Sequence, residues 1–271
     1  GERIIGFCDD WFRAHRRSKK TEVAYRSDLR QFAKVVGPSV PLGEVDAQVV
    51  YRWLQHLRDK GYEPSSIRRK LASLRHFLRE LCARGEIGAN PLDVVKPHLG
   101  LQRKLTRTIT PQLFLALLRV VDERVAAVPP NDVEQAFWAQ RDQTMIWLLC
   151  GTGVRVGELV QVRIADIDAD CTRVRISGKG SRERLAFPVA GDRDRLAAYL
   201  RTHAELYPGC TYLFLNRRGE AIGPEGVRTV LRRVLRDSGV GGDVTPHMLR
   251  HTAATRLLER GVNLQIGRAH V

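Results

Sequence analysis

Four basic side chains in the second half of the sequence stand at turns or at the start of a helix. Arg155 follows a glycine-rich turn, and Lys179 lies between two glycines. His247 and Arg250 come directly after Thr245-Pro246, which is typical of a helix start with a capping threonine and a proline in the first turn. A helix start attracts anions, arginine donates paired hydrogen bonds to phosphate oxygens, and lysine can give a proton to a departing oxygen. The pattern predicts a site that stabilises a phosphate during its transfer.

Each of these residues also has a plain structural interpretation when taken alone. Arg155 could form a surface ion pair with Glu158, Lys179 could simply be solvated at a turn, and His247 could be a structural hydrogen-bonding residue. The prediction therefore depends on the four residues converging, with the guanidinium groups of Arg155 and Arg250 close together.

Familiar nucleotide and metal motifs do not fit. The glycines of 151–157 depart from the dinucleotide-binding fingerprint, and 173–180 lacks the first glycine and the final Ser/Thr of a phosphate-binding loop. His247 and His251 have the spacing of a helical zinc pair, but Met248 stands where a zinc protease needs glutamate. We expect no metal and no cofactor.

The elements that must position these residues divide into two parts. In the first part, apolar spacing predicts helices beginning at Thr21, at Asp46 and at Ser65 or Ser66, with the second ending at Gly61 and the third near Gly85. Arg68, Arg75 and Arg79 form a basic stripe along the third helix. We expect a helical bundle over 1–97 and a linker over 98–107.

The second part, 108–271, is expected to be an α+β domain, mainly helical with a small β-hairpin. A cap at Thr110-Pro111 leads into a helix, and a second helix runs through Phe137–Leu149 to a stop at 151–153. Alternating residues in 173–176 and 185–189 predict a hairpin with Lys179 at its tip. Tyr212–Leu215 is a candidate strand, and helices follow around Val227–Leu235 and from Thr245.

Charge and composition indicate a polyanionic partner. The 271 residues carry a net charge of +15, of which +10 falls on 1–107 and +5 on 108–271. Five widely spaced cysteines argue against a disulfide framework and for a reducing cytosol, and we expect neither a signal peptide nor a membrane span. A cytoplasmic, nucleoid-associated protein is the expectation.

Three blocks together resemble the tyrosine recombinase, or phage integrase, family, with Xer-type and integron-type members closest in style. They are Gly-Thr-Gly-Val-Arg155-Val-Gly-Glu-Leu, Gly-Lys179-Gly-Ser-Arg-Glu-Arg and Thr-Pro-His247-Met-Leu-Arg250-His251-Thr-Ala-Ala-Thr. The first hundred residues resemble the family's helical, SAM-like core-binding domain through two segments, Thr21–Tyr25 and Ser65–Leu71.

The resemblance implies a clamp around double-stranded DNA, in which a tyrosine attacks the scissile phosphate without metal or ATP. It implies that Arg155 and Arg250 stabilise the transition state, that His247 assists at the phosphate and that Lys179 protonates the 5′ oxygen. Glu158 and His251 would support them, and four protomers would assemble on paired sites. DNA-binding candidates in the first part are Thr21, Tyr25, Ser66, Arg68, Arg69, Lys70 and Arg75.

The tyrosine nucleophile has no counterpart in this sequence. None of the six tyrosines follows Arg250, and the chain stops 21 residues after it. The last residues, 266–271, match the translation of a common sequencing-library adapter, so we expect a truncated recombinase that binds DNA without cleaving it. The alternatives are a catalytically dead, sequence-specific DNA-binding regulator and a basic helical protein that binds nucleic acid nonspecifically.

Overall fold

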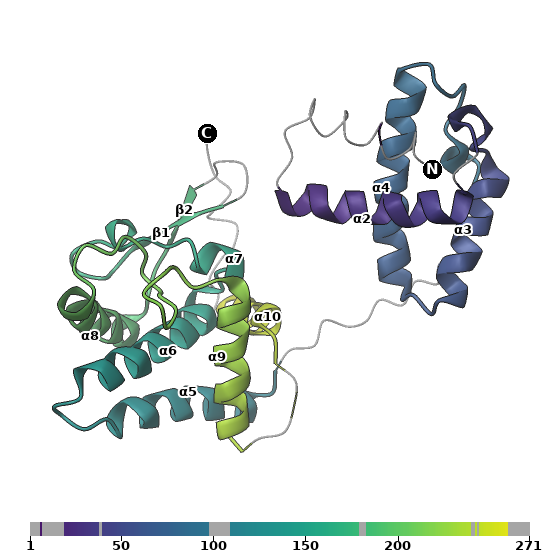
Figure 1. Cartoon of the computed structure of the whole chain (residues 1–271). Helices are drawn as coiled ribbons and strands as arrows, with labels where there is room; N and C mark the ends of the chain where they lie inside the picture. The colour runs from purple at the N-terminus through teal and green to yellow at the C-terminus, as the bar shows by residue number, and fades with distance from the viewer. Residues whose placement is uncertain are drawn as a thin grey trace. The chain divides into compact units, whose positions relative to one another are not determined.

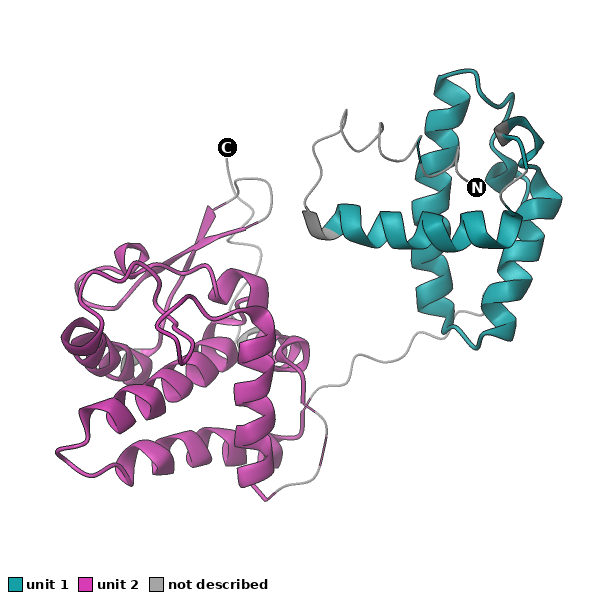
Figure 2. Cartoon of the chain, viewed as in Figure 1, with its two compact units in different colours: residues 1–103 teal, residues 104–271 magenta. Residues whose placement is uncertain are grey.

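The computed structural model divides the chain into two compact units, residues 1–103 and 104–271 (Figures 1 and 2). It describes residues 6, 19–37, 40–97, 109–178, 183–239, 242 and 244–259. The division falls in the segment predicted to be a linker, 98–107, which lies outside the described residues. Each unit is therefore considered by itself.

Unit 1 is helical. Its helices are α2 (Lys19–Val36), α3 (Ala47–Asp59) and α4 (Pro64–Ala83), with short 3-10 turns at Leu42–Glu44 and Pro91–Asp93. Asp46 caps α3 as predicted, because its carboxylate accepts a hydrogen bond from the backbone of Val49 at 2.9 Å. The predicted end of α3 at Gly61 is also confirmed, since this glycine adopts a φ of 70° just beyond the helix.

Two predicted helix starts in unit 1 were wrong by one or two residues. Thr21 lies inside α2, which begins at Lys19, so it does not cap the helix. Neither Ser65 nor Ser66 opens α4, because Pro64 occupies its first turn after Glu63. Proline suits that position since the first N–H groups of a helix have no partner within the helix.

Unit 2 combines helices with one hairpin. Its longer helices are α5 (Pro111–Ala126), α6 (Val133–Thr152), α8 (Ala190–Leu206), α9 (Pro224–Asp237) and α10 (Pro246–Glu259). A short helix, α7 (Val156–Leu159), and a 3-10 turn at Ile164–Asp166 precede the antiparallel strands β1 (Val174–Ser177) and β2 (Glu183–Ala186). The expected mainly helical α+β class is confirmed.

Local signals located most of these elements. Thr110 caps α5 by accepting from the backbone of Leu113 at 3.3 Å, and the predicted hairpin pairs Val174 with Ala186. The predicted strand at Tyr212–Leu215 was wrong, because Tyr212 and Leu215 form only isolated bridges, to Arg163 and Ala221. No helix in the described ranges is long and apolar enough to cross a membrane.

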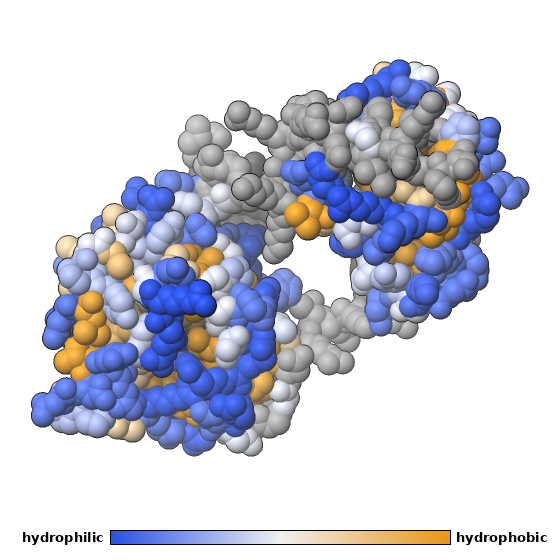
Figure 3. Space-filling view, viewed as in Figure 1, coloured by the Kyte–Doolittle hydropathy of each residue, from blue (hydrophilic) through white to orange (hydrophobic). Residues whose placement is uncertain are grey.

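Each unit has its own hydrophobic core. In unit 1, Phe32 of α2 packs edge-on against Trp53 of α3, with ring centroids 5.3 Å apart. In unit 2, Tyr199 of α8 is fully buried and donates to the carbonyl of Leu213 at 2.7 Å. On the face seen in Figure 3, hydrophilic residues cover much of unit 2 and apolar residues gather in smaller patches. The two buried cores have no described residue in common.

Candidate phosphate-binding site

The turn after α6 positions Arg155. Gly153 ends α6 in the left-handed conformation, with a φ of 60°, and Arg155 then precedes α7 in an extended conformation. The backbone N–H of Arg155 donates to Oε2 of Glu158 at 2.9 Å, and its Nη1 donates to Oε1 at 2.7 Å. The ion pair with Glu158 therefore exists, yet 64% of the Arg155 side chain remains exposed and accessible to a ligand.

Arg250 of α10 reaches the same turn. Its Nη1 donates to the carbonyl oxygen of Gly153, and a Cβ atom on Gly153 would lie 3.9 Å from Cγ of Arg250. Burial lowers the pKa of Arg250, and the nearby charges of Arg155 and Arg184 lower it further, while Glu158 opposes them. The structure thus brings Arg155 and Arg250 together across 95 residues of sequence.

The first turns of α10 carry the two histidines. Thr245 caps the helix as predicted, because its hydroxyl accepts from the backbone of Met248 at 3.3 Å. The Nε2 atoms of His247 and His251 are 3.0 Å apart and the rings are nearly perpendicular. One Nε2 must therefore carry hydrogen and donate to the other. His247 is exposed, so it lies at the surface of the helix that also carries Arg250.

Arg184 is a third guanidinium at this site and was missed by the sequence interpretation. It lies on β2, and its Nη2 donates to Oε2 of Glu158 at 2.7 Å. The sequence carries no signal for it, because the apolar alternation of Leu185 and Phe187 indicates that they face inward, whereas both are exposed and Arg184 shares the more buried face of β2 with Ala186. Lys179 lies outside the described residues, so its predicted role stays a prediction.

Glu158 is the carboxylate common to these arginines. Burial acts to raise its pKa, but hydrogen bonds from the backbone and side chain of Arg155, and the charge of Arg184, outweigh burial and leave the pKa below its usual value. Glu158 is therefore ionised at neutral pH. Among the described residues, Arg155 and Arg184 donate hydrogen bonds to this carboxylate and Arg250 is close enough for its charge to affect the Arg250 pKa, which leaves an excess of positive charge suited to binding a further anion.

The DNA-binding candidates of unit 1 occupy different environments. Arg68 is exposed on α4, and Ser66 and Arg75 are half-buried there. Thr21 and Tyr25 are half-buried on α2, where the Tyr25 ring meets His76 edge-on at 6.2 Å. All five side chains are at least partly exposed, so their positions are compatible with contacts to DNA.

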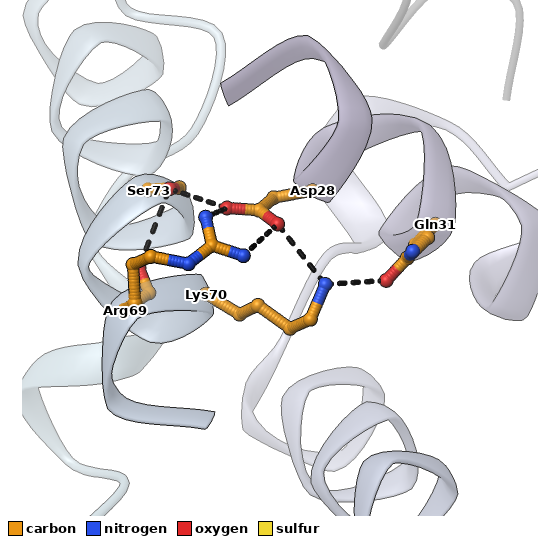
Figure 4. A network of polar contacts seen from close by, with 5 residues as sticks. All are labelled: Asp28, Gln31, Arg69, Lys70 and Ser73. Atoms are coloured by element: carbon orange, nitrogen blue, oxygen red, sulfur yellow. Dashed lines mark hydrogen bonds and ion pairs between the residues drawn. The ribbon is translucent and has the colours of Figure 1, made fainter. Parts of the chain in front are cut away.

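Arg69 and Lys70 face a carboxylate instead (Figure 4). Both Nη atoms of Arg69 donate to Asp28 of α2, and Nζ of Lys70 donates to Asp28 at 3.0 Å and to Gln31 at 2.6 Å. Lys70 is only 3% exposed, so its position does not support a direct phosphate contact. Arg69 keeps half of its side chain exposed.

Asp192, at the start of α8, is a buried carboxyl beside the site's supporting turn. Neither oxygen has a hydrogen-bond partner, and Oδ2 would lie 2.9 Å from a Cβ on Gly151 at the end of α6. Burial raises the pKa of Asp192 to about 6, although the charge of Arg195 opposes the rise. The folded chain therefore keeps this carboxyl protonated up to about pH 6, well above the range in which an ordinary aspartate holds its proton.

Asp192→Asn is expected to stabilise the chain at pH 7.5 but not at pH 4. A carboxyl whose pKa is raised by folding contributes stability at low pH and loses it as pH rises through about 6. Asparagine removes that loss, by roughly 1–2 kcal/mol after allowance for Arg195. Urea unfolding of both chains at the two pH values measures the difference. An equal effect at pH 4 and pH 7.5 would contradict the assignment.

Comparison with known proteins identifies the family. The phage integrase family model matches residues 131–266, and the model for the phage integrase N-terminal SAM-like domain matches residues 4–85. The chain belongs to the phage integrase, or tyrosine recombinase, family. The phage integrase match contains Arg155, Glu158, Arg184 and Arg250, the residues that converge in the structure.

Relatives in sequence agree with this membership, and solved structures share the fold. A tyrosine recombinase of Agathobacter rectalis is 30% identical over 92% of this chain and 81% of its own length. The tyrosine recombinase XerC of Thermodesulfovibrio yellowstonii is 31% identical over 92% of this chain and 80% of its own length. The fold resembles the Tn1549 transposon integrase bound to circular intermediate DNA, with a TM-score of 0.77 and 17% identity over 98% of this chain and 89% of that one. It also resembles the XerH site-specific recombinase bound to a palindromic difH substrate, with a TM-score of 0.74 and 20% identity over 96% of this chain and 74% of that one.

Proposed function

We propose that this tyrosine recombinase chain binds double-stranded DNA and holds the scissile phosphate in the site formed by Arg155 and Arg250. The observation that carries the proposal is the bond from Arg250 to the Gly153 carbonyl, because it brings the second guanidinium to the turn of the first. Guanidinium groups remain charged and donate in parallel, so they suit a phosphate whose non-bridging oxygens gain charge in the transition state.

The other residues have supporting roles in this proposal. His247 assists at the phosphate from the first turns of α10, and Lys179 protonates the departing 5′ oxygen. Glu158 holds Arg155 through two hydrogen bonds, and His251 orients His247 through the contact between their rings. Arg68 and Arg75 on α4, with Thr21, Tyr25 and Ser66, contact the DNA backbone from unit 1.

The reaction class is site-specific strand exchange through a phosphotyrosine intermediate. None of the six tyrosines follows Arg250, so we propose that the chain as given binds DNA without forming that intermediate. Solved relatives include a lambda integrase dimer bound to a core site and a lambda integrase tetramer bound to a Holliday junction. By analogy, we propose assembly with other protomers on paired sites, at the nucleoid in the cytoplasm.

Two measurements test the proposal. The chain is expected to enrich a common sequence from a random duplex library, because a specific recombinase reads base edges in addition to phosphates. Absence of enrichment would favour the nonspecific nucleic-acid binder. A nicked suicide substrate carrying the selected site is expected to be bound but not linked covalently. A protein–DNA adduct that survives denaturation would refute the predicted lack of a nucleophile.

A further inference from the structure

Glu158 receives hydrogen bonds from two separate segments of unit 2. From the turn before α7, Arg155 donates its backbone N–H to Oε2 and its Nη1 to Oε1. From β2, Arg184 donates its Nη2 to Oε2. The Glu158 side chain is about 10% exposed, whereas the Arg184 side chain is 31% exposed. A largely buried carboxylate therefore joins the hairpin to the Arg155 turn.

The same hairpin offers a close structural parallel that lacks the site. Asp166 accepts from the backbone N–H of Arg163 at 2.9 Å and from Nε of Arg175, on β1, at 3.1 Å. In both cases an arginine on one strand of the hairpin donates to the acidic residue of a capping turn: Arg184 on β2 to Glu158, and Arg175 on β1 to Asp166. Among the charges that alter the pKa of Arg250 are Arg155, Glu158 and Arg184, but neither Arg175 nor Asp166. Arg175 and Arg184 therefore make similar hydrogen bonds to a carboxylate, but only the charge of Arg184 is close enough to affect Arg250.

We propose that Arg184 is a positioning residue of the phosphate site: by sharing Glu158 with Arg155, it fixes the carboxylate and prevents it from cancelling the positive charge of Arg155. This inference rests on the proposed function, because it assumes that Arg155 and Arg250 bind phosphate. The positive charges of Arg155, Arg184 and Arg250 stand against the single negative charge of Glu158 and leave an excess of positive charge. That excess is what a phosphate diester needs in order to bind.

The test uses the chain as it exists and inorganic phosphate as the probe. Arg184→Gln removes the charge but retains an N–H donor for Glu158, whereas Arg184→Lys retains the charge. Arg175→Gln on β1 is the matched control, since it removes an arginine from the same hairpin and from a similar carboxylate. Phosphate is titrated while the side-chain ¹⁵Nε signals of Arg155 and Arg250 are followed. The ¹³Cδ signal of Glu158 is followed separately against pH.

We expect Arg184→Gln to weaken phosphate binding by about fivefold, the effect of losing one unit charge at a few ångströms in a partly exposed site. Arg184→Lys and Arg175→Gln are expected to remain within about twofold of the parent. The pKa of Glu158 is expected to rise in Arg184→Gln and to stay unchanged in the other two variants, because the charge of Arg184 contributes to lowering it. A role limited to anchoring the hairpin would not distinguish lysine from glutamine in this way.

The possible failures are distinguishable. If the parent binds phosphate and Arg184→Gln binds it equally well, the inference is overturned and the proposed function stands. The same holds if Arg184→Lys is as weak as Arg184→Gln, because charge is then not the cause. If the signals of Arg155 and Arg250 in the parent do not respond to phosphate, the phosphate site itself fails, and both the proposed function and the inference fall.

Discussion

Arg250→Ala is expected to slow covalent DNA cleavage by about 10²–10³-fold in a version of this chain extended to supply the family's tyrosine. Arg250 comes from α10 and meets the Arg155 turn through the Gly153 carbonyl, so alanine removes a preorganised charge from the reacting phosphate. Losing one such donor costs roughly 3–4 kcal/mol of transition-state stabilisation. The measurement is the rate of adduct formation on a nicked substrate carrying the selected site.

Two comparisons make that result specific to the site. Arg119→Ala removes an exposed arginine of α5 whose Nε lies 3.7 Å from Glu123, and it is expected to leave the cleavage rate unchanged. Duplex affinity of Arg250→Ala is expected to fall far less than the rate, because phosphate contacts along a duplex contribute to affinity without taking part in the transition state. A cleavage rate within threefold of the parent would show that Arg250 does not act on the transition state.

Asp28→Ala is expected to destabilise unit 1 by about 3–5 kcal/mol. Asp28 is 1% exposed and joins α2 to α4 by accepting hydrogen bonds from Arg69, Lys70 and Ser73 (Figure 4). Alanine leaves the Lys70 ammonium buried without its carboxylate, which is the costly way to break a buried ion pair. Hydrogen exchange of amides in α2 and α4 reports the loss locally, as a fall in protection of about 10²–10⁴-fold.

Removal of the cation should have a different outcome from removal of the carboxylate. Lys70→Met is expected to cost much less than Asp28→Ala, because Asp28 retains Arg69 and Ser73 and the methionine fills apolar space. Glu80→Gln, which affects the exposed Glu80–Arg84 pair on the same helix, is expected to change stability by under about 1 kcal/mol. Equal losses for Asp28→Ala and Glu80→Gln would refute the importance of the buried network.

Local chemistry made much of the fold predictable from the sequence. Asp46, Thr110 and Thr245 cap their helices because each needs only a backbone N–H two or three residues ahead. The hairpin followed from the alternation of Val174 and Ile176 with arginines. The strand expected at Tyr212–Leu215 failed because an extended apolar run needs partner strands, and this one meets only single-residue bridges.

Contacts between segments far apart in the sequence were harder to predict. The convergence of Arg155 and Arg250 was predicted from a joint pattern, whereas Arg184 was missed because its partner Glu158 is 26 residues away. Lys70 was a DNA-binding candidate through the resemblance of Ser65–Leu71 to the family's core-binding domain, and nothing in that segment indicates that it faces Asp28 across 42 residues. Charge in a sequence therefore identified the class of ligand better than it identified the contacting side chains.

The independence of the two cores gives the chain a modular character. No described buried residue belongs to both hydrophobic clusters, so sequence change in one unit leaves the interior of the other intact. A chimera in which residues 1–103 come from a relative with another target sequence would keep the interior that supports Arg155 and Arg250. Residues 1–103 and 104–271 are therefore natural units for exchange in engineering, because each carries its own buried core.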